Sequence, residues 1–130
     1  MTEIETALRE IARDVYAELG SGHDEKVYHR AMEVDLRLRG IKYDSERVLE
    51  LRYKDHYVGE NYADLIVGSG DETVVVELKA VTCMLGLAEK QQLKKYMKTL
   101  HVKSGLLINF QRPETSRRKR KEDGPEIVVP

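Results

Sequence analysis

The spacing of apolar residues changes once along this chain, and that change limits the folds it can adopt. Over residues 4 to 38 apolar residues recur every three or four positions, as on one face of a helix. From Arg47 onward the spacing falls to two, as in strands that bury one face. A chain of 130 residues has the size of one compact domain, so we expect residues 1 to 130 to form a single domain of helices and strands.

Two helices are expected before the first strand. The first begins near Ile4 and is stopped by the run Gly20-Ser21-Gly22, and the second begins near Asp24 and ends at Gly40. The short connection predicts a helical hairpin. The apolar stripe expected on the second helix consists of Val27, Ala31, Val34 and Leu38.

Strands are expected in the rest of the chain, with one further helix between them. The polar pair Lys54-Asp55 predicts a hairpin turn, and the turn-forming run Gly68-Ser69-Gly70-Asp71 precedes an apolar, β-branched segment typical of a sheet interior. The predicted order is ααβββαβ with a short added edge strand, an α/β (α+β) fold with a mixed central sheet flanked by helices. The expected elements are strands at residues 47–53, 57–67, 73–79, 105–110 and 126–129 and a helix at 88–100.

Composition excludes several classes of protein. No apolar run approaches the roughly 18 residues that a membrane helix needs, and no signal peptide follows Met1, so we expect no membrane association and a cytoplasmic location. The single cysteine, Cys83, excludes an intramolecular disulfide and a cysteine-based structural zinc site. The net charge of -1 argues against a wholly basic nucleic-acid binder.

Asp64 and the run Glu77-Leu78-Lys79 are the residues most suggestive of chemistry. If residues 73–79 form a strand, Glu77 and Lys79 leave the same face of it, and Asp64 lies on a neighbouring strand. Two carboxylates can hold a divalent ion that neutralises a scissile phosphate, and the lysine can orient the attacking water. Hard oxygen ligands without nearby histidine or cysteine indicate Mg²⁺ or Mn²⁺. Taken alone, Glu-Leu-Lys is a common tripeptide, and a strand edge with a surface ion pair is the alternative interpretation.

Two further pairs support a site. Glu25 and Tyr28 lie about one helical turn apart after the glycine run, so both can point toward the sheet. Gln92 and Tyr96 are four apart on the expected third helix, where an amide and a phenol could hold a phosphate, the water or an acidic ligand.

Basic residues gather late in the chain. Residues 90–130 contain 11 bases and 4 acids, whereas residues 1–89 contain 11 bases and 19 acids. The candidate contacts to phosphate lie in a predicted basic loop at about residues 112–124 and on the expected third helix, which supplies two lysines. The alternative interpretation of such a charge run is a solvated loop without a binding role. These residues are Arg117, Arg118, Lys119, Arg120, Lys121, Lys94 and Lys95.

The motifs together resemble the GxxExxY proteins, a branch of the PD-(D/E)XK nuclease superfamily. Gly22, Glu25 and Tyr28 fit the naming motif, Asp64 fits the first acid, Glu77-Leu78-Lys79 fits the (D/E)XK element, and Gln92 to Tyr96 resembles a Gln-x-x-x-Tyr motif. The resemblance covers about residues 4–129, although Ala63 stands where the superfamily has proline before the first acid.

The resemblance implies a restriction-endonuclease-like core and a metal-dependent nuclease, with DNA favoured over RNA. It makes Asp64 and Glu77 metal ligands, the Leu78 carbonyl a third ligand and Glu25 an additional acid near the ion. Lys79 becomes the water-activating lysine, with Gln92 and Tyr96 in support.

Other functions stay open at this point. A nuclease-fold module can bind nucleic acid without cutting it, and a structural domain can use the acidic first part and the basic end of the chain for protein contacts. Holliday junction resolvases share the acid and Glu-x-Lys pattern and work as dimers, so a homodimer is possible here. The Gln92 to Tyr96 motif points away from a resolvase.

Overall fold

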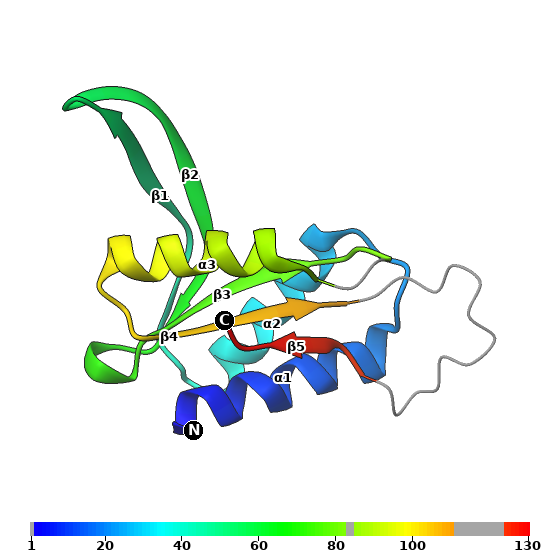
Figure 1. Cartoon of the computed structure of the whole chain (residues 1–130). Helices are drawn as coiled ribbons and strands as arrows, with labels where there is room; N and C mark the ends of the chain where they lie inside the picture. The colour runs from blue at the N-terminus through cyan, green and yellow to red at the C-terminus, as the bar shows by residue number, and fades with distance from the viewer. Residues whose placement is uncertain (1, 83–84, 111–123) are drawn as a thin grey trace.

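The computed structural model describes residues 2–82, 85–110 and 124–130, and it places helices on both faces of one sheet (Figure 1). The elements follow one another in the predicted order, with a short 3-10 helix, η1, that the apolar pattern does not predict. In chain order they are α1 (Glu3–Leu19), α2 (Glu25–Leu38), β1 (Tyr43–Tyr53), β2 (His56–Val67), η1 (Gly70–Glu72), β3 (Val74–Lys79), α3 (Leu87–Leu100), β4 (Ser104–Asn109) and β5 (Glu126–Val128).

The sheet is mixed, with the strand order β1-β2-β3-β4-β5. Neighbouring strands are antiparallel except for β3 and β4, which are parallel. Parallel strands need a crossover connection, and α3 provides it. The α+β fold with a mixed central sheet is therefore confirmed, and it is consistent with the restriction-endonuclease-like core that the resemblance implies.

The two faces of the sheet carry separate apolar clusters. Successive side chains of a strand point to opposite faces, so β3 supplies Val74, Val76 and Leu78 to the cluster under α1 and α2 and Val75 to the cluster under α3. The same alternation puts Glu77 on the α3 face, with Val75. The position of the candidate acids thus follows from which β3 side chains the core requires.

Strands β1 and β2 extend beyond the sheet as a two-stranded arm (Figure 1). β2 pairs with β3 only over Leu65–Val67, whereas it pairs with β1 along almost all of its length. At the point of departure Glu46, opposite Asp64, has a φ of 52°. Strict alternation fails there, because Ala63 and Ile66 both join the cluster under α3 although they are three residues apart. The arm therefore bends away from the sheet at Asp64.

The predicted turn at Lys54-Asp55 closes this arm. Both residues have positive φ, 49° and 66°, and Tyr53 pairs directly with His56, as a two-residue type I′ hairpin requires. Leu49 and Ala63 are buried near the base of the arm, but further out the apolar side chains are exposed, because none of the helices in the described residues packs there. Those that are exposed are Val48, Leu51, Tyr53, Tyr57, Val58 and Tyr62.

The predicted buried stripe of α2 is wrong. Val34 is 46% exposed and Leu38 is 80% exposed, and both line a groove of about 340 Å³ between α1 and α2. Two stripes on α2 have helical spacing, and the sheet covers the one with the larger side chains because this buries more apolar area. The buried residues of α2 are Tyr28, His29, Met32 and Leu36.

The predicted helical hairpin of α1 and α2 is held by polar contacts at its open side. Arg39, which follows α2, reaches Glu10 and Asp14 of α1 at 3.0 and 3.2 Å.

Within the ranges that the structure describes, no helix combines the length and the apolar character needed to cross a bilayer.

We expect Gly68→Ala to destabilise the fold more than Gly40→Ala. Both glycines have positive φ, +91° at Gly68 and +69° at Gly40. A Cβ added at Gly68 would lie 2.8 Å from the carbonyl oxygen of Glu72, whereas a Cβ added at Gly40 would have no atom within 4 Å. Backbone strain and overpacking together should lower the free energy of unfolding by about 3 kcal/mol at Gly68, against about 1 kcal/mol at Gly40. Urea denaturation measures both, and equal losses would contradict the crowding at Gly68.

Candidate active site

Asp64 and Glu77 lie side by side at the point where β2 leaves β3. The Asp64 N–H donates to Glu77 Oε1 at 3.0 Å, and the Leu78 N–H donates to Asp64 Oδ2 at 2.8 Å. Regular pairing between the two strands ends one position earlier, at Leu65 and Val76, so these two bonds replace the next rung of the ladder. Each carboxylate is thereby held by the backbone of the other strand.

Both carboxyl groups have raised pKa values. Glu77 is only 5% exposed, and this burial raises its pKa to about 8, with the negative charge of Asp64 adding to the shift. Burial also raises the pKa of Asp64, against the hydrogen bond from the Leu78 N–H. Keeping two such acids ionised costs free energy, so the pair is suited to receiving a positive charge.

Lys79 and Glu25 complete the charged part of the site. Lys79 ends β3 two residues after Glu77, and its positive charge lowers the pKa of Glu77, Asp64 and Glu25. Glu25 begins α2 and is exposed as a residue, but partial burial of its carboxyl group raises its pKa, with the charge of Asp64 adding to this. Glu25 therefore lies in the field of the acid pair although it comes from a helix distant in sequence.

Tyr96 and Gln92 approach the same acids from α3. Tyr96 is buried, and its pKa is raised by that burial and by the charges of Glu77 and Asp64, while a hydrogen bond with Gln92 lowers it. Gln92 lies on the exposed rim. The amide and the phenol thus stand at the border between the acids and solvent.

His29 belongs to this neighbourhood, although the sequence analysis does not single it out. It is 8% exposed, and its Nε2 lies 2.9 Å from Ser45 Oγ and 3.4 Å from Glu33 Oε2. Its charge, when it is protonated, lowers the pKa of Asp64 and Glu25. The signal that points to it is its spacing of four residues from Glu25, which puts both on one face of α2.

Asn109 ties down the chain that leaves Lys79. Its fully buried side chain accepts the Val81 N–H at 3.0 Å and donates to the Val81 carbonyl at 3.2 Å. It also donates to Glu126 Oε1 at 3.2 Å, and Glu126 Oε1 accepts the Leu85 N–H at 3.4 Å. Asn109 pairs with Lys79 across β3 and β4, so this network holds Val81 and Leu85, which lie between the lysine and α3.

Asn109→Leu is expected to lower the free energy of unfolding by about 1–2 kcal/mol, because the partly buried Val81 N–H and carbonyl would lose these partners. The comparison is Asn61→Leu, at a partly exposed position of the arm opposite Leu49, and we expect it to cost less than about 0.5 kcal/mol. Chemical denaturation of both variants measures the difference. A loss at Asn109 no larger than that at Asn61 would show that the network does not hold this segment.

The structure does not bring every candidate residue to the acids. Lys94 and Lys95 are exposed on α3, whereas Leu93 and Tyr96 face the sheet. Leu78 is buried, and its N–H is bonded to Asp64. The basic run from Arg117 to Lys121, with most of the predicted loop at 112–124, lies outside the described residues.

The acid pair fits a hard divalent ion. Mg²⁺ is usually bound through one or two carboxylates while it keeps several waters, and Asp64 and Glu77 offer two adjacent carboxylates with raised pKa values. Among the residues that the structure describes, no group of three or more histidine, cysteine, aspartate or glutamate side chains is close enough to hold an ion together. Asp64 and Glu77 are adjacent and could hold it together, with water completing the coordination.

The order of elements and the mixed sheet, with two acids and a lysine where β2 separates from β3, are consistent with an α+β nuclease-like domain. The chain belongs to the PD-(D/E)XK nuclease superfamily, whose family model matches residues 2–121. Nucleases of this superfamily generally use divalent metal ions.

A comparison with solved structures supports the fold. The crystal structure of SSO0001 superposes with a TM-score of 0.53 at 17% sequence identity, over 81% of this chain. The chain spans half the length of that protein's chain, so the likeness concerns the fold alone. No curated protein matches the sequence significantly.

Proposed function

We propose that this protein is a metal-dependent nuclease that hydrolyses phosphodiester bonds in DNA. The observation that carries the proposal is the pair of Asp64, which is half-buried, and Glu77, which is buried, each held by the backbone of the other strand, with Lys79 two residues further along β3. A buried acid with a pKa near 8 is a costly feature for a structural role, whereas a divalent cation at this position would offset that cost.

Each residue has a stated part in the proposed reaction. Asp64 and Glu77 would hold the ion, with Glu25 and the Leu78 carbonyl as further candidate ligands, and the ion would supply positive charge where negative charge develops on the phosphate. Lys79 would orient the attacking water, because an ammonium group fixed beside it favours hydroxide over neutral water. Gln92 and Tyr96 would contact the phosphate or that water from α3.

Narrower features belong to the same proposal. The fit of Gly22, Glu25 and Tyr28 to the naming motif supports membership of the GxxExxY family, and Mg²⁺ or Mn²⁺ is the ion that two carboxylates suit best. Lys94 and Lys95 and the run from Arg117 to Lys121 would contact DNA through phosphates. We also propose a cytoplasmic location. A measurement of the molecular mass in solution would show whether the protein forms a homodimer.

Cleavage by the purified protein tests this function. Labelled linear duplex, single-stranded and four-way-junction DNA would be incubated with Mg²⁺ or Mn²⁺, alongside Asp64→Asn and Glu77→Ala. We expect product with the wild type and none with either variant, and the preferred substrate separates an exonuclease from a junction resolvase. Equal cleavage by Glu77→Ala, from a preparation free of other nucleases, would show that the site is wrong.

A control variant tests whether the loss of any acid lowers cleavage. Glu60→Gln removes one acid from the exposed arm, so its cleavage is expected to equal that of the wild type. DNA binding without product in either metal would replace the proposal with a nuclease-fold binding module.

A further inference from the structure

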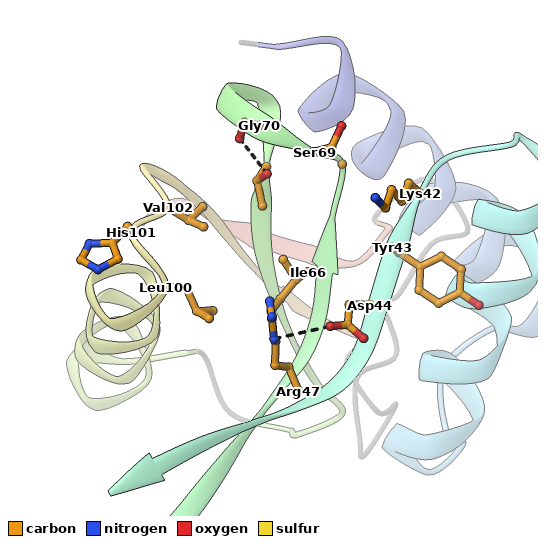
Figure 2. A pocket seen from close by; sticks show the side chains of 12 residues that line it. Lys42, Tyr43, Asp44, Arg47, Ile66, Ser69, Gly70, Leu100, His101 and Val102 are labelled. Atoms are coloured by element: carbon orange, nitrogen blue, oxygen red, sulfur yellow. Dashed lines mark hydrogen bonds and ion pairs between the residues drawn. The ribbon is translucent and has the colours of Figure 1, made fainter. Parts of the chain in front are cut away.

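A cavity lies on the α3 side of the sheet, at the end of α3 and beside the start of β1 (Figure 2). Its volume is about 490 Å³, which is in the range of sites for small molecules. Ile66, Leu100 and Val102 give it an apolar part, and Lys42, Arg47 and His101 give it basic groups. None of these residues was singled out by the sequence motifs.

The bend of the arm brings Arg47 into this cavity. Asp44 pairs with Ile66 across the strands, so both lie on the α3 face. Strict alternation would put Arg47, three residues after Asp44, on the opposite face, but the positive φ of Glu46 interrupts the alternation. Arg47 Nε consequently lies 3.5 Å from Asp44 Oδ2, and Figure 2 shows the guanidinium projecting into the pocket.

The cavity adjoins the candidate active site. Arg47 pairs with Ala63, the residue before Asp64. On α3, Leu100 lies one turn after Tyr96, whose pKa is raised by the charges of the two acids. Gly68, which lines the far part, is four residues from Asp64, roughly 13 Å along a strand. The cavity and the acid pair therefore lie near each other along β2, within the length of a short oligonucleotide.

The lining matches a nucleotide better than a purely apolar ligand. An arginine fork and a lysine suit a phosphate, and the apolar side chains suit the face of a base. The negative charge of Asp44 would repel an anion. The Asp44 carboxylate contacts the Nε of Arg47, however, so it also orients the guanidinium group. The acids at positions 64 and 77 repel phosphate, so a strand held at this neighbouring cavity would be easier to position for cleavage.

We propose that this cavity binds one nucleotide of the substrate strand next to the scissile phosphate. Arg47 and Lys42 contact the phosphate of that nucleotide, and Ile66, Leu100 and Val102 contact its base. This rests on the proposed nuclease function and extends it by assigning the residues that hold the strand. Arg47 acts in binding and takes no part in the chemical step.

Nucleotide binding can be measured without any cleavage. The full chain in EDTA would be titrated with a deoxynucleoside 5′-monophosphate and followed by the amide NMR signals of Gly68, Ser69, Gly70, Thr73 and Val102. We expect these signals to shift, and Arg47→Ala to weaken the affinity by roughly tenfold or more. Asp44→Asn, which removes the opposing charge, is expected to tighten it.

Arg52→Ala is the matched control, because Arg52 is on the same strand but is paired with Glu50 at 2.9 Å on the arm. Its affinity should equal that of the wild type. Equal weakening by Arg47→Ala and Arg52→Ala would overturn the assignment. The absence of shifts would also overturn it. If inorganic phosphate bound as tightly as the nucleotide, the cavity would be a site for anions only, and the assignment would again be wrong.

Cleavage kinetics separate this inference from the proposed function. With oligonucleotides, Arg47→Ala is expected to raise KM by roughly tenfold and to leave kcat unchanged. Cleavage in which Arg47→Ala has no effect would overturn the inference and leave the nuclease intact. Shifts at the cavity with no cleavage of any DNA would mean that the nuclease function had failed while a nucleotide site remained.

Discussion

Glu77→Gln is expected to stabilise the metal-free protein at alkaline pH. The pKa of Glu77 is about 8 in the folded chain and near 4.5 when the group is exposed, so the folded state holds a proton that the unfolded chain releases between these values. The stability that this bound proton gives the folded state is therefore fully present below about pH 4.5, and it is lost as the pH rises through 8. A shift of this size corresponds to a loss on the order of 3–5 kcal/mol, which glutamine avoids.

Urea denaturation in EDTA at pH 5 and pH 9 measures this effect. We expect wild-type stability to fall between the two values by more than that of Glu77→Gln, whose amide oxygen can still accept the Asp64 N–H. Glu60→Gln, on the exposed arm, provides the comparison for removing an acid elsewhere. If the wild type and Glu77→Gln lose the same stability, the acid pair does not carry the alkaline destabilisation.

The same substitution should abolish function. Mg²⁺ or Mn²⁺ is expected to raise the Tm of the wild type and to leave that of Glu77→Gln unchanged, because the variant loses a charged ligand. Without the ion, the transition state loses several kcal/mol of charge stabilisation, so the rate of DNA cleavage should fall by roughly a thousandfold or more. An acid that costs stability and is required for activity is what separates a functional site from a structural ion pair.

The periodicity of the sequence predicts the elements because the buried faces are long and regular. The helix of residues 3–19 and the interior strand of 74–79 carry unbroken patterns, and the turn at Lys54-Asp55 is a local property of two residues. The face of α2 is not predictable in this way. Two stripes share helical spacing there, so spacing alone does not select the one with the larger side chains, which contains Tyr28 and Met32.

The acids of the candidate site are visible in the sequence, whereas the geometry that joins them is not. Alternation predicts that Glu77 and Lys79 share a face, but it does not predict the bend at Glu46 and Asp64 that ends the ladder and turns both carboxylates to backbone N–H groups. That bend depends on a positive φ at a glutamate, which sequence patterns do not indicate. The cavity beside Arg47 follows from the same bend.

Asn109 and His29 show a second limit. Each is buried and acts through tertiary partners, Val81 and Glu126 for the asparagine and Ser45 and Glu33 for the histidine. The spacing of His29 from Glu25 indicates a shared face of α2, but it does not indicate burial, because a polar residue's hydrogen-bond partners decide whether burial is tolerated. Catalytic carboxylates have a recurring spacing, but the residues that hold their surroundings do not.

Lys79→Met is expected to lower kcat by roughly a hundredfold to a thousandfold while KM changes little, since methionine keeps the bulk of the side chain and removes its charge. Lys79 lowers the pKa of Asp64, Glu77 and Glu25, so its removal should raise all three values. The acids would then ionise at higher pH, and the rise of kcat/KM with pH should move in the alkaline direction.

Rates of DNA cleavage from pH 6 to pH 10 measure both effects, with Lys98→Met on the exposed side of α3 as the matched loss of a lysine. That control is expected to keep the wild-type rate and profile. A slower Lys79→Met enzyme with an unshifted profile would mean that the lysine acts on the attacking water alone. An unchanged kcat would remove Lys79 from the reaction, because a group beside the reacting atoms cannot lose its charge without affecting the transition state.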